Sequence, residues 1–129
     1  MRDTDWSKEK FDIDLEFGKK GESKFKEIFS NGDKVEVKTE RDKWLQTGNL
    51  VIELECAGKK SGLSTTEADY WVHQLSIDTE IVGMFIIPVE RLKSRVKWLV
   101  EDGQARVTMG GDGYRSKIAL VPISKLFRG

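Results

Sequence analysis

The pattern of apolar and polar residues predicts a strand and then a helix at the start of the chain. Over residues 11–17 single acidic residues separate the apolar ones, which are Phe11, Ile13, Leu15 and Phe17. This period of two predicts a strand that ends at Gly18. From about residue 20 to residue 30 the apolar spacing becomes helical, with a stripe made of Phe25, Ile28 and Phe29. The predicted helix ends at Asn31-Gly32.

Two acid-bearing strands follow. Val35-Glu36-Val37-Lys38 alternates apolar and charged residues, and so does the segment from Leu50 to Glu55. Side chains two residues apart in a strand point the same way. If the two strands pair as a hairpin, one face is apolar. The other face then carries Glu36, Lys38, Glu53 and Glu55.

The second half of the chain predicts further strands and one helix. Strands are expected over residues 68–75, which are rich in aromatic residues, and over residues 84–87 and 118–121, which are apolar. Helical spacing from Val89 to Val100 ends before Gly103. Pro88 and Pro122 each end a strand and precede a turn of helix. The order of elements is α+β, and residues 1–129 form one domain with a central mixed sheet flanked by helices.

Composition fits one soluble domain. The 129 residues are 34% charged and 38% hydrophobic, which is polar but not the composition of a disordered chain. The numbers of basic and acidic residues are equal, so no overall positive field indicates a nucleic-acid partner. One cysteine, Cys56, excludes an internal disulfide and a cysteine-rich zinc site. No signal peptide or membrane span is visible, and we expect a cytoplasmic protein.

The acidic face of the predicted hairpin suggests chemistry. Three acids and a lysine on one small patch are what a Mg²⁺-dependent phosphodiester hydrolase needs. The same pattern also occurs on the solvated face of an ordinary hairpin. Glu22 lies three residues before Phe25, on the stripe expected to be buried, so it is a candidate further ligand. Alternatively, it only favours the dipole at the start of the helix.

Several segments of the chain resemble those of the PD-(D/E)XK nuclease superfamily, in particular small nucleases often carried by phages. The resemblance covers roughly residues 11–127. It rests on Glu36-Val37-Lys38-Thr39, Thr47-Gly48-Asn49, Ile52-Glu53, Ser61-Gly62 and Ala68-Asp69-Tyr70-Trp71. It implies a restriction-endonuclease-like or Holliday-junction-resolvase-like fold. The implied activity is Mg²⁺-dependent cleavage of DNA, with Mn²⁺ as a substitute, in the host cytoplasm if a phage encodes the chain.

The resemblance leaves two assignments of the motif open. In the first, Glu36 and Lys38 are the Glu-x-Lys pair, and Asp33 or Asp12 supplies the first acid. In the second, Glu36 replaces the first Asp, Glu53-x-Glu55 takes the Glu-x-Lys place, and Lys38 is a migrated lysine. The second fits the predicted hairpin better, because Glu36, Lys38 and Glu53 would share one face.

The resemblance implies a role for each candidate residue. Glu36 and Glu53 would hold the metal, with Glu22 as a further ligand. Lys38 would hold the attacking water or neutralise charge on the phosphate. Glu55 is expected to be structural. His73, the single histidine, is most simply a hydrogen-bonded structural side chain, with proton transfer as the alternative.

Other residues suggest partners. Lys43, Lys59 and Lys60, with Arg41, would contact the DNA backbone near the end of the hairpin. Trp44 would stack on a base or cover the core. Basic residues of the late helix are most simply its solvated face; they are Lys93, Arg95 and Lys97. Two other functions remain open, a non-catalytic nucleic-acid-binding module on the same fold and a small structural or interaction protein. A homodimer is also plausible.

Overall fold

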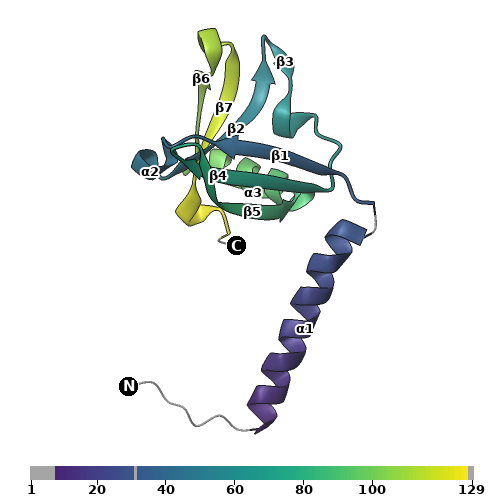
Figure 1. The fold of residues 1–129 in the computed structure, drawn as a ribbon. Coiled ribbons are helices and arrows are strands. Elements are labelled where there is room, and N and C mark those ends of the chain that lie inside the picture. Colours follow the sequence, from purple (N-terminus) through teal and green to yellow (C-terminus); the bar gives the residue numbers. More distant parts are fainter. Residues whose placement is uncertain (1–7, 31, 128–129) are drawn as a thin grey trace. The chain divides into compact units, whose positions relative to one another are not determined.

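The computed structural model describes residues 8–30 and 32–127, with side chains from residue 15 onward, and Figure 1 traces the chain. Contacts divide the chain into two compact units, Met1–Asp33 and Lys34–Gly129. The architecture is α+β, as predicted. No helix within the described residues is long and apolar enough to cross a membrane.

Residues 8–30 of the first unit form one long helix, α1 (Lys8–Ser30), so the strand predicted over residues 11–17 is wrong. The alternation there is short, and the Lys and Glu residues on both sides of it favour a helix despite Gly18 and Gly21. Ion pairs at helical spacing support α1, Glu22 with Lys26 at 4.0 Å and Lys24 with Glu27 at 3.9 Å. The helix predicted over residues 20–30 is the second half of α1.

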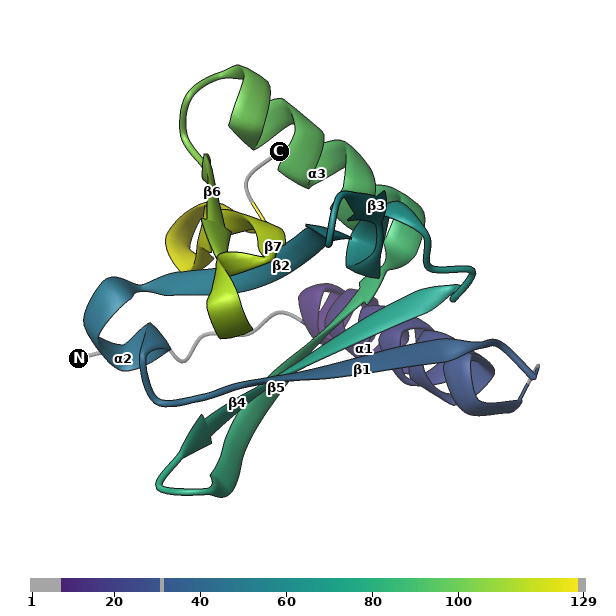
Figure 2. The ribbon, with the colours of Figure 1, turned by 90° about the horizontal axis from the view of Figure 1, so that it is seen from above.

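The second unit begins with a three-stranded sheet, which we call sheet A. Its strands are β1 (Val35–Glu40), β4 (Tyr70–Ile77) and β5 (Glu80–Pro88), in the order β1-β4-β5. β1 and β4 are parallel, with Lys38 opposite His73, whereas β4 and β5 are antiparallel. Figure 2 shows the three strands side by side. The strands predicted over residues 68–75 and 84–87 correspond to β4 and β5.

A second sheet, sheet B, is antiparallel and has the order β3-β2-β7-β6. Its strands are β3 (Lys59–Lys60), β2 (Asn49–Cys56), β7 (Ser116–Pro122) and β6 (Arg106–Gly110). The predicted hairpin between β1 and β2 is therefore wrong, and so is the single central sheet. The short helix α2 (Trp44–Thr47), closed by Gly48 with a φ of 70°, carries the chain from sheet A to sheet B. β2 then pairs along most of its length with β7.

One apolar core joins the two sheets to the helix α3 (Val89–Glu101), which was predicted from its spacing. The buried face of α3 consists of Val89, Leu92, Val96 and Leu99. These residues pack with the inner residues of both sheets, including Leu50, Ile52, Trp71 and Val121. Short 3₁₀ turns complete the unit: η1 (Gly62–Ser64), η2 (Asp112–Tyr114) and η3 (Ile123–Lys125). Pro88 and Pro122 end β5 and β7, as predicted, before α3 and η3.

Candidate active site

Sheets A and B border a hollow of about 500 Å³ that contains two of the predicted catalytic residues, Lys38 and Glu53. Lys38 comes from β1 and Glu53 from β2, so the hollow spans strands of different sheets. The other residues that line it are Thr39, Glu40, Arg41, Lys43, Val51, Trp71, His73, Gly111, Ser116 and Ile118. Lys38 and Glu53 therefore lie on one surface without the hairpin that the sequence predicted.

Lys38 pairs with another predicted catalytic residue, Glu36, which is not among the residues that line the hollow. Lys38 Nζ lies 3.8 Å from Glu36 Oε2, and both side chains are partly exposed. The pair forms because residues two apart in a strand point to the same side. Glu36 Oε1 also accepts a hydrogen bond from Thr66 Oγ1 at 3.2 Å. The carboxylate is thus held between β1 and the loop that precedes β4.

The Glu53 carboxylate is oriented by two hydroxyl groups. Ser61 Oγ donates to Glu53 Oε2 at 2.9 Å, and Ser116 Oγ donates to Glu53 Oε1 at 3.0 Å. Each carboxylate oxygen has about two acceptor positions, so each keeps one after these bonds. Glu53 is therefore fixed in orientation while it retains the capacity to bind a cation or a water molecule.

The turn that carries Ser61 depends on the glycine after it. Gly62 has a φ of 54°, and a Cβ at this position would lie 2.3 Å from the backbone oxygen of Glu53. Ser61 N also donates to Leu54 O at 3.0 Å. A glycine is required here because the turn passes so close to β2. The Ser61-Gly62 segment thus sets the position of the hydroxyl that contacts Glu53.

A buried network lies beside the charged residues of the hollow. Glu40 Oε1 lies 2.8 Å from His73 Nε2 and also accepts a hydrogen bond from the backbone N–H of Val51. Trp71 Nε1 donates to His73 Nδ1 at 3.0 Å. An indole N–H is only a donor, so His73 Nδ1 is the acceptor and Nε2 carries the proton that is donated to Glu40. His73 is thus a fully hydrogen-bonded buried side chain, as expected.

Sequence reasoning missed three residues of the site: Glu40, Ser61 and Ser116. A signal existed for Glu40, which continues the Glu36, Lys38 alternation on the same face of β1. Its partner Val51 lies in the other sheet, so the contact needs the tertiary fold. Ser61 appeared only as part of a motif, and Ser116 is 63 residues from Glu53.

The three predicted metal ligands belong to different units: Glu22 lies in α1 of the first unit, and Glu36 and Glu53 lie in β1 and β2 of the second. Residues 8–30 and 32–127 contain no group of three or more His, Cys, Asp or Glu side chains that could hold a metal. Glu22 was expected on a buried stripe, but its side chain is 66% exposed and pairs with Lys26. The alternative first acid Asp12 lies in a helix rather than a strand, and its side chain is outside the described residues.

Only some of the predicted basic residues lie near Lys38 and Glu53. Arg41 and Lys43 line the hollow, whereas Lys59 and Lys60 form β3 and are not among its lining residues. Trp44 donates from Nε1 to Ser76 O at 2.9 Å and packs against the core. These contacts support the alternative in which Trp44 covers the core.

Two other acids have structural contacts. Glu55 pairs with Lys117 across β2 and β7 at 3.5 Å, which agrees with the structural role expected for it. Asp69 Oδ2 accepts a hydrogen bond from Lys34 N at 2.9 Å and ties the starts of β1 and β4 together. Neither residue lines the hollow.

Comparison with known proteins gives no assignment for this site. The chain matches no protein-family model, no curated protein and no solved structure. Its chemistry is therefore argued from the residues that line the hollow.

Proposed function

We propose that the chain is a divalent-cation-dependent phosphodiester hydrolase that cuts DNA. The observation that supports the proposal is the presence of Lys38 and Glu53 in one hollow, with Glu36 paired to Lys38. This grouping favours the second motif assignment, in which Glu36 and Glu53 are the acids and Lys38 is the lysine. The resemblance of the surrounding segments to PD-(D/E)XK nucleases points to the same activity.

The carboxylates of the site fit a Mg²⁺ ion that is bound by two protein ligands. Mg²⁺ usually binds one or two carboxylates and fills its remaining positions with water and substrate phosphate oxygens. Glu36 and Glu53 would supply the carboxylates, and each is already oriented by hydroxyl groups. A bound Mg²⁺ would lower the pKa of a water molecule and polarise the phosphate.

The remaining residues of the hollow have roles in binding and charge compensation. Arg41 and Lys43 would bind phosphates on either side of the cleaved bond. The Lys38 ammonium would hold the attacking water and offset the negative charge that develops on the phosphoryl group. The water oxygen bonds to phosphorus and gives up one proton to solvent, the bond to the leaving oxygen breaks, and the leaving oxygen takes up a proton from solvent. No covalent enzyme intermediate is needed.

A cleavage assay with matched variants tests the proposal. Supercoiled plasmid and branched DNA are incubated with Mg²⁺ or Mn²⁺ and wild-type protein, Lys38→Ala or Glu53→Gln. Two variants outside the hollow are the controls. Lys34→Ala removes an exposed lysine just before β1, and Glu55→Gln changes an acid of β2, the strand that carries Glu53. We expect metal-dependent cutting that both site variants lose and both controls keep. Cutting that survives Glu53→Gln but not Lys38→Ala would favour the first motif assignment.

A second candidate function is a DNA-binding module without catalysis. The observation that favours it is the pair of basic side chains, Arg41 and Lys43, in the lining of the hollow, because they can bind phosphates without a metal. This module would bind DNA with an affinity that falls strongly as salt rises, but it would not cut DNA in the presence of any divalent metal ion. Absence of both cutting and binding would leave a structural or interaction protein.

A further inference from the structure

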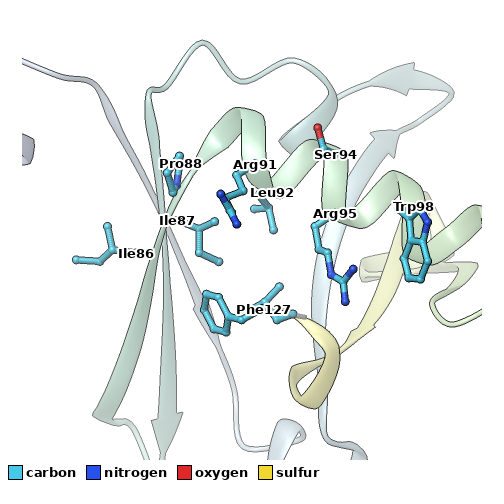
Figure 3. Close-up of a pocket in the computed structure, with 10 residues that line it drawn as sticks. Ile86, Ile87, Pro88, Arg91, Leu92, Ser94, Arg95, Trp98 and Phe127 are labelled. Carbon is cyan, nitrogen blue, oxygen red and sulfur yellow. The ribbon is translucent and has the colours of Figure 1, made fainter. Parts of the chain in front are cut away.

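A second hollow, of about 580 Å³, lies between α3, the end of β5 and the C-terminal turn. Its size falls within the ~300–1,000 Å³ range of ligand sites. Buried apolar residues form its floor, namely Ile87, Leu92 and Leu126. Figure 3 shows Arg91, Arg95 and Trp98 along one side of α3, with Phe127 across from them.

The polar part of this hollow comes from one face of α3. Arg91, Ser94, Arg95 and Trp98 follow the i, i+3, i+4, i+7 spacing that places side chains together on a helix. The face thus combines two guanidinium groups, a hydroxyl group and an indole. No Asp or Glu is among the residues that line the hollow, so its charge is positive.

The two arginines differ in how they are held. Arg95 donates from Nε and Nη2 to Lys125 O at 2.9 and 2.7 Å, and its guanidinium lies 5.0 Å from the centre of the Trp98 ring. Arg91 is exposed, and no ion pair or hydrogen bond of its side chain occurs with the described residues. One guanidinium is therefore fixed beside an aromatic ring, and the other is available to an anion.

Two aromatic rings at this hollow are accessible to solvent. Trp98 is 49% exposed and Phe127 is 63% exposed. Exposed aromatic rings beside arginines are the usual platform for single-stranded nucleic acid, because every base has a π-face and every nucleotide carries a phosphate. A protein partner would use aromatic residues and arginine as well. None of the described acidic residues lines the hollow, which favours a nucleic acid, a polyanion, over a protein partner.

We propose that this hollow binds an unpaired nucleic-acid strand. Bases would stack on Trp98 and Phe127, while Arg91 and the Ser94 hydroxyl contact the sugar-phosphate backbone. The inference extends the proposed action on DNA: it adds an unpaired segment to the substrate, such as the displaced strand of a branch. Binding here uses neither the metal nor Glu53, so it can be measured separately from cleavage.

The test is binding of a fluorescent twelve-residue oligothymidylate in EDTA, measured by anisotropy at low and moderate salt. The variants are Arg91→Ala, Trp98→Ala and the conservative Trp98→Phe. The matched control is Lys97→Ala, which removes a charge from α3 but does not line the hollow. We expect Trp98→Ala to weaken binding roughly 5- to 150-fold, the range for loss of one stacked base. Arg91→Ala should weaken binding too, whereas Trp98→Phe and Lys97→Ala should stay near wild type.

Several results would overturn this inference. Equal binding by Trp98→Ala, Arg91→Ala and Lys97→Ala would show that the strand does not use this hollow. Loss of self-association in Trp98→Ala without loss of oligonucleotide binding would show that the surface contacts a second copy instead. Repeating the titration with Glu53→Gln separates the two proposals, because binding at this hollow should not depend on Glu53. If the wild-type protein never cuts DNA but both proteins bind the oligonucleotide, only the proposed hydrolase is rejected.

Discussion

Glu40 and His73 join neighbouring strands of sheet A through a buried contact of 2.8 Å between Glu40 Oε1 and His73 Nε2. The same carboxylate oxygen accepts the backbone N–H of Val51 in sheet B. One side chain therefore links β1, which carries Glu36 and Lys38, to β2, which carries Glu53. The relative position of these three residues depends on a residue that has no direct role in the proposed chemistry.

Replacing Glu40 should destabilise the protein more than an acidic residue usually does. Glu40→Ala leaves the buried His73 Nε2–H and the part-buried backbone N–H of Val51 without this partner, and a buried donor without a partner costs about 1–3 kcal/mol. We expect the free energy of unfolding to fall by about 2–5 kcal/mol, measured by urea denaturation. Glu55→Ala is the control, because its half-exposed ion pair with Lys117 should contribute less than about 1 kcal/mol. Equal losses in the two variants would mean that Glu40 does not link the sheets.

The hydrogen bonds of His73 predict one ring tautomer. Because Nδ1 accepts from Trp71 and Nε2 donates to Glu40, the ring should carry its proton on Nε2. Nitrogen-15 chemical shifts of the histidine ring near neutral pH measure this directly, and the single histidine removes any ambiguity of assignment. Trp71→Phe should shift Nδ1 and leave Nε2 protonated. A proton found on Nδ1 would contradict the arrangement.

The sequence predicted those elements whose signals are local. β4, β5, β7 and α3 all appear where apolar spacing and breakers such as Pro88 predicted them. The errors concern strand partners and the first segment, and the strands β3 and β6 were not predicted. β1 and β2 each alternate as hairpin strands would, but alternation does not identify the partner strand: β1 pairs with β4 in sheet A, and β2 pairs with β7 in sheet B. Residues 11–17 alternate too, yet they lie within α1.

The candidate site could be predicted only in part, for a related reason. Glu36 and Lys38 share a face because they are two residues apart, and that can be read from the sequence. Glu53 lies on the surface of the same hollow as Lys38 because the two sheets approach each other there, not because of the expected hairpin. Ser116 reaches Glu53 across 63 residues, and no local pattern predicts such a contact.

The hydroxyl groups that orient Glu53 should matter for metal binding more than for stability. Residues that hydrogen-bond to metal ligands typically contribute about 10–100-fold to metal affinity or activity. We expect Ser61→Ala and Ser116→Ala each to raise the Mg²⁺ concentration needed for half-maximal cleavage by about 10-fold or more. Ser124→Ala is the control, because Ser124 is exposed and lines neither hollow.

A double variant separates the two serines. Because both hydroxyls orient one carboxylate, the effects of Ser61→Ala and Ser116→Ala should not be additive. The Mg²⁺ dependence of the double variant, compared with that of each single variant, measures the coupling. If all three variants show the Mg²⁺ dependence of the wild type, Glu53 is not a metal ligand.

Gly62 should tolerate substitution less well than a nearby glycine with the same backbone conformation. In Gly62→Ala the new Cβ would meet the Glu53 backbone oxygen at 2.3 Å, so the turn or β2 must move. Gly58 is the matched control, because it also has a positive φ, 79°, but has nothing within 4 Å of an added Cβ. Both variants carry the strain of a positive φ, about 1 kcal/mol or slightly more. Only Gly62→Ala should add a clash that displaces Ser61 from Glu53. We therefore expect a clearly larger drop in the urea midpoint, and a larger loss of cleavage, for Gly62→Ala than for Gly58→Ala. Similar behaviour of the two variants would show that the close approach of this turn to β2 does not hold Glu53 in place.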